Sequence, residues 1–242
     1  PTSLLTSPLF HVSGLSAGVV TALFAGTTTY IYEGRFDPQN ILRVIDKYKI
    51  TSWGGAVPTA LKRVLDEAPN HNLDYESMLV VGGGGAPMPE TLIARTKQIF
   101  KNVEHNFGYG YGLTESGAIT VVNWGDDLNN FPRSPGKPMP TIEVKLIDDD
   151  GNEIFDDEME GEICVRSPSV MLGYYKNQIE SKKSLNKDRF LSTGDYGYRK
   201  DDLYFISSRR TDLILRGAEN VYPQEIEILL DQYDGVAESA VI

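Results

Sequence analysis

Strand-like and helix-like segments alternate along the first half of the chain, and this alternation most constrains its fold. The strand-like segments are short, apolar and often β-branched, whereas the helix-like segments repeat apolar residues at 3.6-residue spacing. Strands and helices in alternation form a parallel sheet covered by helices. We therefore predict an α/β fold with strands at 3–13, 27–32, 50–53, 78–81 and 103–107, and helices at 15–25, 38–48, 58–68 and 89–100.

The pattern changes after about residue 131. Apolar residues alternate with charged ones from Ile142 to Leu146, as in a half-buried strand, and Asp150-Gly151 is a hairpin signal. Further strands are predicted at 161–166 and 203–206. The sequence thus predicts an α/β subdomain followed by a small antiparallel, barrel-like β subdomain, at residues 1–132 and 133–208.

Composition narrows the possible partners. A formal net charge of −11 argues against a nucleic-acid partner, and the acidic stretch from Asp148 to Glu162 is most simply a solvated hairpin. The single cysteine, Cys164, excludes an internal disulfide and forms no metal-ligand cluster with the three histidines. We find no signal peptide and no apolar run of about 18 residues. We therefore predict a cytoplasmic protein without a transmembrane segment; its oligomeric state is not indicated.

One glycine-rich stretch combines the features of a nucleotide site. From Asn106 to Gly117, glycines alternate with aromatic residues, and Thr114 and Glu115 follow Tyr111 closely. Glycine lets a backbone approach a ligand, tyrosine offers a flat apolar face, and a hydroxyl can donate to a phosphate oxygen. A carboxylate is a ligand that Mg²⁺ prefers. The stretch indicates a purine nucleotide with its metal; a glycine-rich surface turn is the alternative.

Other motifs also allow two interpretations. Gly82–Gly85 before Ala86 predicts either a flat ligand lying against the backbone or a tight strand-to-helix turn. Asp195, after a glycine turn, is placed to accept both hydroxyls of a ribose, or forms an Asp turn. Arg209-Arg210 and Asp212 are also compatible with a surface ion pair.

A hydrolase motif is also present. Gly14–Gly18 matches the G-x-S-x-G pattern of a nucleophile elbow, with Ser16 as the nucleophile. Asp46 or Asp74, followed by His105, would complete the order of a catalytic triad. Because the pattern is loose and small residues are common where helices begin, a serine hydrolase is kept only as an alternative.

Six motifs in order over nearly the whole chain together resemble the adenylate-forming superfamily, which includes acyl-CoA synthetases, nonribosomal-peptide adenylation domains and beetle luciferases. The matching segments are Pro8–His11, Gly84–Met88, Tyr111–Glu115, Gly161–Arg166 with Val170–Tyr175, Ser192–Asp195, and Arg209–Ile214 with Gly217–Pro223 and Glu225–Glu227.

The resemblance implies an enzyme that activates a carboxylic acid with MgATP to an acyl-adenylate and passes the acyl group to coenzyme A. It implies that Tyr111 stacks on adenine and that Glu115 holds Mg²⁺. The other residues that it assigns to ATP or AMP are Gly84, Gly85 and Ala86 along the adenine, Gly112, Thr114 at the α-phosphate, and Asp195 and Arg209 at the ribose.

The resemblance also assigns residues to the acyl and thiol substrates. His11 is expected at the mouth of the acyl pocket, and Gly217 beside the pantetheine arm of coenzyme A. The expected pocket wall includes Trp53, Gly55, Val57 and Gly83. Because Phe10-His11 offers no carboxylate for a substrate ammonium, an acid without an α-amine fits better than an amino acid. We therefore expect part of an acyl-CoA synthetase acting on a fatty acid.

Two motifs of the superfamily are missing from the sequence: the Ser/Thr/Gly-rich phosphate loop and the lysine near the C-terminus. We therefore expect a central fragment that binds AMP-like ligands but adenylates weakly or not at all. Residues 209–242 are expected to be the hinge and the truncated start of a C-terminal domain, with Thr211 in place of the usual Asp or Lys. A non-catalytic adenylate-binding relative is the second alternative.

Overall fold

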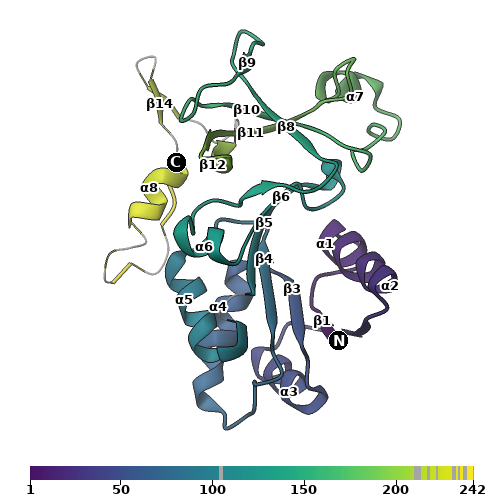
Figure 1. Cartoon of the computed structure of the whole chain (residues 1–242), viewed down its shortest axis with the longest axis vertical. Helices are drawn as coiled ribbons and strands as arrows, with labels where there is room; N and C mark the ends of the chain where they lie inside the picture. Colours follow the sequence, from purple (N-terminus) through teal and green to yellow (C-terminus); the bar gives the residue numbers. More distant parts are fainter. Residues whose placement is uncertain are drawn as a thin grey trace. The chain divides into compact units, whose positions relative to one another are not determined.

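The computed structural model separates the chain into two compact units, Pro1–Met139 and Pro140–Ile242, which are treated separately (Figure 1). The residues that it describes are 1–103, 106–209, 214–216, 219–221, 223–230, 233, 235–236 and 239–241. In this described part, no helix is both long and apolar enough to cross a membrane.

The first unit is built on a seven-stranded sheet with strand order β2-β1-β3-β4-β5-β6-β7. The strands β1 to β5 pair in parallel, as predicted, whereas β6 and β7 extend the sheet in antiparallel fashion. The strands are Thr2–Leu5 (β1), Thr28–Ile31 (β2), Ser52–Ala56 (β3), Val80–Gly84 (β4), Phe107–Tyr111 (β5), Val121–Trp124 (β6) and Lys137–Pro138 (β7). The two antiparallel strands were not expected from the sequence.

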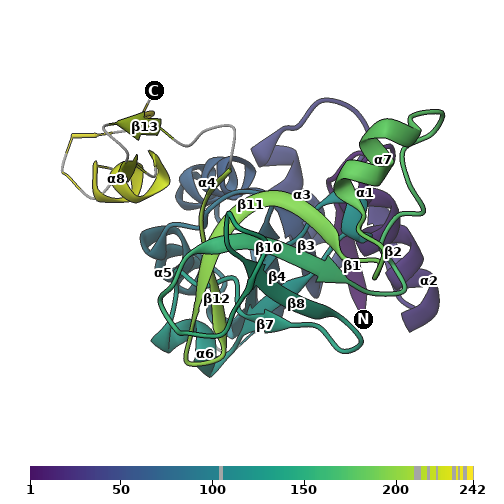
Figure 2. The ribbon, with the colours of Figure 1, turned by 90° about the horizontal axis from the view of Figure 1, so that it is seen from above.

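Helices cover both faces of this sheet, with α1 and α2 on the side opposite α4 and α5 (Figures 1 and 2). The helical segments are Val12–Gly14 (α1), a π-helical turn at Leu15–Val20, Thr21–Ala25 (α2), Pro38–Tyr48 (α3), Pro58–Glu67 (α4), Glu90–Ile99 (α5) and Asp126–Asn130 (α6), with 3₁₀ turns at Ala68–Asn70, Lys101–Val103 and Thr114–Ser116. The four predicted helices are confirmed to within a few residues.

Sequence periodicity explains the core beneath α3 and α4. The apolar residues at helical spacing in α4, Leu61, Val64 and Leu65, are completely buried, and so are Ile41 and Ile45 of α3. Helix α3 begins where the sequence indicates, because the Asp37 side chain accepts hydrogen bonds from the backbone N–H groups of the first turn and Pro38 follows it.

The glycine–aromatic stretch was predicted to follow a strand at 103–107, but it is itself the strand β5. Gly108 lies directly opposite Trp124 of β6, and a Cβ at Gly108 would lie 2.0 Å from the indole. Glycine here makes room for a neighbouring ring. On β5, burial raises the pKa of Tyr109 to about 12. Similarly, β4 includes Gly82–Gly84, where the sequence predicted a strand ending at Val81.

The second unit contains the predicted antiparallel sheet, with strand order β12-β11-β10-β8-β9. The strands are Glu143–Ile147 (β8), Glu153–Ile154 (β9), Gly161–Arg166 (β10), Leu191–Lys200 (β11) and Leu203–Arg209 (β12); β13 (Ile214–Arg216) pairs with β14 (Glu219–Val221), and the helices are Gln178–Ser184 (α7) and Pro223–Leu230 (α8). The hairpin at Asp150-Gly151 is confirmed between β8 and β9, where Asp148 accepts a hydrogen bond from the Asn152 N–H. Cys164 is buried in β10, and burial raises its thiol pKa to about 11.

Candidate functional site

Four neighbouring parallel strands of the first unit, in the order β1-β3-β4-β5, bring most of the predicted site residues to one edge of the sheet. The register pairs Ala56 of β3 with Gly83 of β4, and Gly84 of β4 with Gly110 of β5. The segments that follow these strands are therefore neighbours. This is the carboxyl edge, where parallel α/β sheets bind ligands.

His11 follows β1 and caps the helical segment that begins at Val12. Its Nδ1 atom accepts a hydrogen bond from the Ser13 N–H at 3.2 Å and lies 2.7 Å from the Ser13 hydroxyl oxygen. The imidazole is exposed. In the same loop, the Ser7 hydroxyl donates to the Gly55 carbonyl at 3.3 Å and so joins the segments that follow β1 and β3.

The predicted wall of the acyl pocket divides into exposed and buried members. Gly55 is exposed with φ +71°, and Val57 is 43% exposed. Trp53 is completely buried in the core, where its Nε1–H donates to the Thr6 hydroxyl at 3.0 Å. A Cβ at Gly83 would lie 2.2 Å from the terminal methyl of Met88. Gly55 and Val57 therefore lie at the surface, whereas Trp53 packs in the core of the sheet and does not line the surface.

Packing and backbone conformation account for Gly84 and Gly85 at the end of β4. A Cβ at Gly84 would lie 2.5 Å from the Gly110 carbonyl oxygen on the adjacent strand. Gly85 has φ +80°, a conformation that favours glycine, and begins the turn toward α5. Gly85 and Ala86 are exposed at this turn. The backbone at Gly84 and Gly85 is therefore that of a tight strand-to-helix turn. The contact of Gly84, Gly85 and Ala86 with adenine stays a prediction.

The segment after β5 is a tight loop held by buried hydroxyls. The Ser116 hydroxyl donates to the Leu113 carbonyl at 3.0 Å, and the Thr120 hydroxyl donates to Ser116 at 2.9 Å. Ala118 has φ +122°, which is uncommon for a residue with a side chain, and such strain concentrates at functional sites. A Cβ at Gly112 would lie 1.6 Å from the Ala118 carbonyl oxygen, so the loop requires glycine there.

This loop presents the hydroxyl and the carboxylate that the sequence assigns to phosphate and metal. Thr114 is exposed, and Tyr111 and Glu115 are partly exposed. Across the described residues, no group of three His, Cys, Asp or Glu side chains is arranged to hold a metal. Mg²⁺ is usually held by one or two carboxylates together with substrate phosphates and waters, so a single carboxylate at Glu115 fits a magnesium that arrives with a nucleotide.

In the second unit, Asp195 lies within a strand, and the alternative of an Asp turn is wrong. The register between β10 and β11 shifts here, because Glu162 pairs with Tyr196 whereas Cys164 pairs with Ser192. The residues between Ser192 and Tyr196 thus form a bulge opposite Ile163, with Gly194 at φ +74°.

Side-chain hydrogen bonds of Thr193 and Glu162 hold this bulge. The Thr193 hydroxyl donates to the Ile163 carbonyl at 2.8 Å and accepts from the Asp195 N–H at 3.0 Å. A carboxylate oxygen of Glu162 accepts from the Gly194 N–H at 3.0 Å. Thr193 and Glu162 lie within the motifs Ser192–Asp195 and Gly161–Arg166, but only the register of β10 against β11 reveals them as positioning residues.

The structure brings together the two residues predicted at the ribose. Arg209 of β12 lies opposite Asp195, and its Nε–H donates to the Asp195 carboxylate at 2.9 Å. The Asp195 side chain is 5% exposed and that of Arg209 is 64% exposed, so the guanidinium extends from a buried acid toward solvent. Some residues with roles predicted from the sequence lie outside the described residues; they are His105, Arg210, Thr211, Asp212 and Gly217.

The geometry of a nucleophile elbow is not found at Ser16. An elbow places its serine at a sharp turn between a strand and a helix, whereas Ser16 lies inside the continuous helical run Val12–Ala25. Gly14 has helical torsion angles, and a Cβ there would lie 2.1 Å from the Pro8 carbonyl oxygen. The glycine of the motif thus serves packing, which removes the structural basis for the hydrolase alternative.

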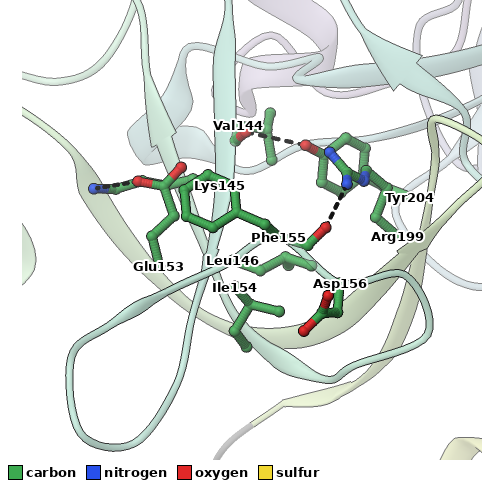
Figure 3. Close-up of a pocket in the computed structure, with 9 residues that line it drawn as sticks. All are labelled: Val144, Lys145, Leu146, Glu153, Ile154, Phe155, Asp156, Arg199 and Tyr204. Atoms are coloured by element: carbon green, nitrogen blue, oxygen red, sulfur yellow. Dashed lines mark hydrogen bonds and ion pairs between the residues drawn. The ribbon is translucent and has the colours of Figure 1, made fainter.

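A small cavity in the second unit contains none of the predicted site residues (Figure 3). It has a volume of about 100 Å³ and lies between the β8–β9 hairpin and residues of β11 and β12. Two hydrogen bonds join residues of its lining: the Tyr204 hydroxyl donates to the Val144 carbonyl at 3.0 Å, and Arg199 donates to the Phe155 carbonyl at 2.7 Å. These contacts close the hairpin against the sheet.

Comparison with known proteins agrees with this arrangement. A model of the AMP-binding enzyme family matches residues 1–175, and the chain belongs to this family. The long-chain-fatty-acid–CoA ligase of Salmonella typhimurium is 33% identical over 97% of this chain and 41% of its own length. The 2-succinylbenzoate–CoA ligase of Oceanobacillus iheyensis is 34% identical over 98% of this chain and 47% of its own length.

The fold has a close solved counterpart. The o-succinylbenzoate CoA synthetase of Bacillus subtilis, solved with its acyl-adenylate intermediate, superposes with a TM-score of 0.86 at 32% identity over 99% of this chain and 47% of that protein. The same enzyme has been solved with ATP and magnesium. The resemblance to adenylate-forming enzymes is confirmed, and the chain spans less than half the length of each of these relatives.

Proposed function

We propose that this chain provides the adenylate-binding part of an acyl-CoA synthetase, which activates a carboxylic acid with MgATP and transfers the acyl group to coenzyme A. The observation that carries the proposal is the register between β4 and β5, which pairs Gly84 with Gly110. It makes neighbours of the exposed turn Gly85-Ala86 and of Tyr111, the two elements proposed to line the adenine. The CoA ligases among its relatives support the same reaction class.

Each polar residue then has a defined task. The Thr114 hydroxyl donates to the α-phosphate, and Glu115 binds the magnesium ion that neutralises the phosphate charge. Asp195 accepts the hydroxyls of the ribose, and Arg209 binds the same sugar. Gly112 keeps the loop closed, so that Thr114 and Glu115 are positioned before the ligand binds.

We propose a fatty acid as the carboxylic substrate. The exposed residues proposed for the acyl site, His11, Gly55 and Val57, carry no carboxylate to pair with an α-amine. The exposed Val57 side chain adds apolar surface. Gly217 is proposed to lie beside the pantetheine arm, and Trp53 and Gly83 to support the acyl site from beneath.

Calorimetric titration with non-hydrolysable acyl-sulfamoyl-adenosines of increasing acyl length tests the proposal. We expect binding that weakens about 10- to 100-fold in Asp195→Ala, because a hydrogen bond to a charged acceptor contributes about 1.5–3 kcal/mol. The Asp157→Ala variant, which removes an exposed carboxylate of the same unit, is the matched control and should bind as the parent does. The acyl group that binds most tightly identifies the substrate class.

Three results would refute parts of the proposal. A folded chain that binds no acyl-sulfamoyl-adenosine, or binds it equally well without Asp195, contradicts the adenylate site. Tightest binding of an aminoacyl analogue contradicts the fatty-acid substrate and leaves the adenylate site intact.

A further inference from the structure

The segment between β10 and β11 carries several exposed apolar side chains. Leu172 is 93% exposed, Tyr175 is 88% exposed, and Ile179 on α7 is 72% exposed. Helix α7 buries none of its residues. Figure 1 shows α7 projecting from the end of the five-stranded sheet. We call residues 171–190 the β10–β11 segment.

This segment is basic, although the chain as a whole is acidic. It contains five basic and two acidic residues, a net charge of +3, whereas the whole chain has a net charge of −11. The basic side chains are all exposed; they are Lys176, Lys182, Lys183, Lys187 and Arg189. Among the described residues, Lys182 and Lys187 have no carboxylate within 4.0 Å. A cationic surface therefore faces solvent here.

Apolar and basic side chains are interleaved within the segment. Ile179 is followed on α7 by Lys182 and Lys183, three and four residues later, so these side chains share one face of the helix. In the loop before α7, the Lys176 ammonium lies 5.2 Å from the centre of the Tyr175 ring. Ile179 and Tyr175 thus each have a cationic neighbour.

The backbone of the segment is fixed by its own hydrogen bonds. The Ser181 hydroxyl accepts from the Tyr174 N–H at 2.8 Å and donates to the Asn177 carbonyl at 2.7 Å. Arg189 donates to the Met171 carbonyl at 2.8 Å and thereby joins the two ends of the segment. The apolar and basic side chains are therefore attached to a backbone that hydrogen bonds hold in place.

We propose that the β10–β11 segment binds the surface of an anionic lipid bilayer. Leu172, Tyr175 and Ile179 enter the boundary between headgroups and acyl chains, while the lysines bind lipid phosphates. Interleaved apolar and basic side chains suit this interface, which offers both environments within a few ångströms. A nucleic acid gains little from Leu172 and Ile179, because it binds exposed side chains by base stacking on aromatic rings.

Co-sedimentation with 100 nm vesicles tests the proposal. We expect the chain to bind vesicles of about 70% phosphatidylcholine and 30% phosphatidylserine, and to bind pure phosphatidylcholine at least 10-fold more weakly. Each lysine near an anionic surface contributes about fivefold to the partition coefficient. Lys182→Ala/Lys183→Ala/Lys187→Ala should therefore lower it by about 100-fold, and Leu172→Ser/Tyr175→Ser/Ile179→Ser by at least 10-fold.

Two matched variants distinguish binding by this segment from non-specific effects of net charge and of exposed apolar surface. Lys47→Ala/Lys62→Ala/Lys101→Ala removes three exposed lysines from the first unit and gives the same net charge as the test variant. Leu23→Ser/Phe24→Ser removes two other exposed apolar side chains, which are 77% and 91% exposed. Both should bind as the parent does. Absence of vesicle binding, or binding that depends on Leu23 and Phe24 but not on the β10–β11 segment, overturns the proposal.

Discussion

Thr193→Val isolates the hydroxyl that holds Asp195 in the bulge of β11. Valine has nearly the same shape as threonine but cannot make the bonds to the Ile163 carbonyl and the Asp195 N–H, which measure 2.8 and 3.0 Å. Both lost partners are backbone groups in a partly buried part of the sheet. At about 1–1.5 kcal/mol for each bond, the free energy of unfolding should fall by about 2–3 kcal/mol.

Urea denaturation followed by circular dichroism measures this change, and Thr193→Ser is the control because it keeps the hydroxyl. For a chain of this size the predicted loss lowers Tm by about 4–12 °C. Adenylate binding should weaken as well, since the Asp195 backbone is released. Equal stability of the valine variant and the parent would refute the role of the hydroxyl, as would a serine variant that is destabilised as much as the valine variant.

Two further predictions concern packing and pH. Gly14→Ala should lower the free energy of unfolding in urea by about 2–3 kcal/mol, because its Cβ would overlap the Pro8 backbone, whereas Gly54→Ala, with no atom within 4 Å, should be nearly neutral. Burial disfavours the Tyr109 phenolate and raises the pKa of this side chain from 10.0 to about 12 in the folded state. Between pH 10 and 12, the tyrosine therefore loses its proton in the unfolded state but keeps it in the folded state. The stability that Tyr109 contributes is complete below pH 10 and falls by about 2–3 kcal/mol as the pH rises to 12. The free energy of unfolding, measured in urea from pH 8 to 11.5, should therefore decrease less in Tyr109→Phe than in the parent. An equal decrease in both proteins would contradict this cause.

Local patterns were sufficient to predict four helical segments of the first unit, although they missed the short helix α6. In α4, the residues at helical spacing, Leu61, Val64 and Leu65, are those that the fold buries completely. In α3, Asp37 and Pro38 fix the start of the helix through neighbouring backbone groups. Such features depend on residues close in sequence, and a single sequence therefore contains the information needed to predict them.

The strands β5 and β11, on which residues of the candidate site lie, were misplaced or missed for the opposite reason. Glycine beside aromatic residues, and glycine before aspartate, are turn signals when they are considered locally. In the fold, Gly108 makes room for Trp124 on the next strand, and the Gly194 bulge is held by Glu162 on β10. These causes lie 16 and 32 residues away in the sequence, so local pattern could not supply them.

The structure also changes which motif residues can be used to test the function. Gly84 and Gly112 belong to segments that the sequence assigns to a nucleotide, yet a side chain at either would overlap backbone atoms of the protein itself. Loss of binding in a variant of these glycines would thus follow from a distorted sheet or loop, with or without a ligand contact. Thr114 is exposed on a loop that Ser116 and Thr120 hold closed. Its proposed contact with the phosphate can be removed without disturbing those bonds, and its substitution therefore measures ligand binding more directly than that of any glycine beside it.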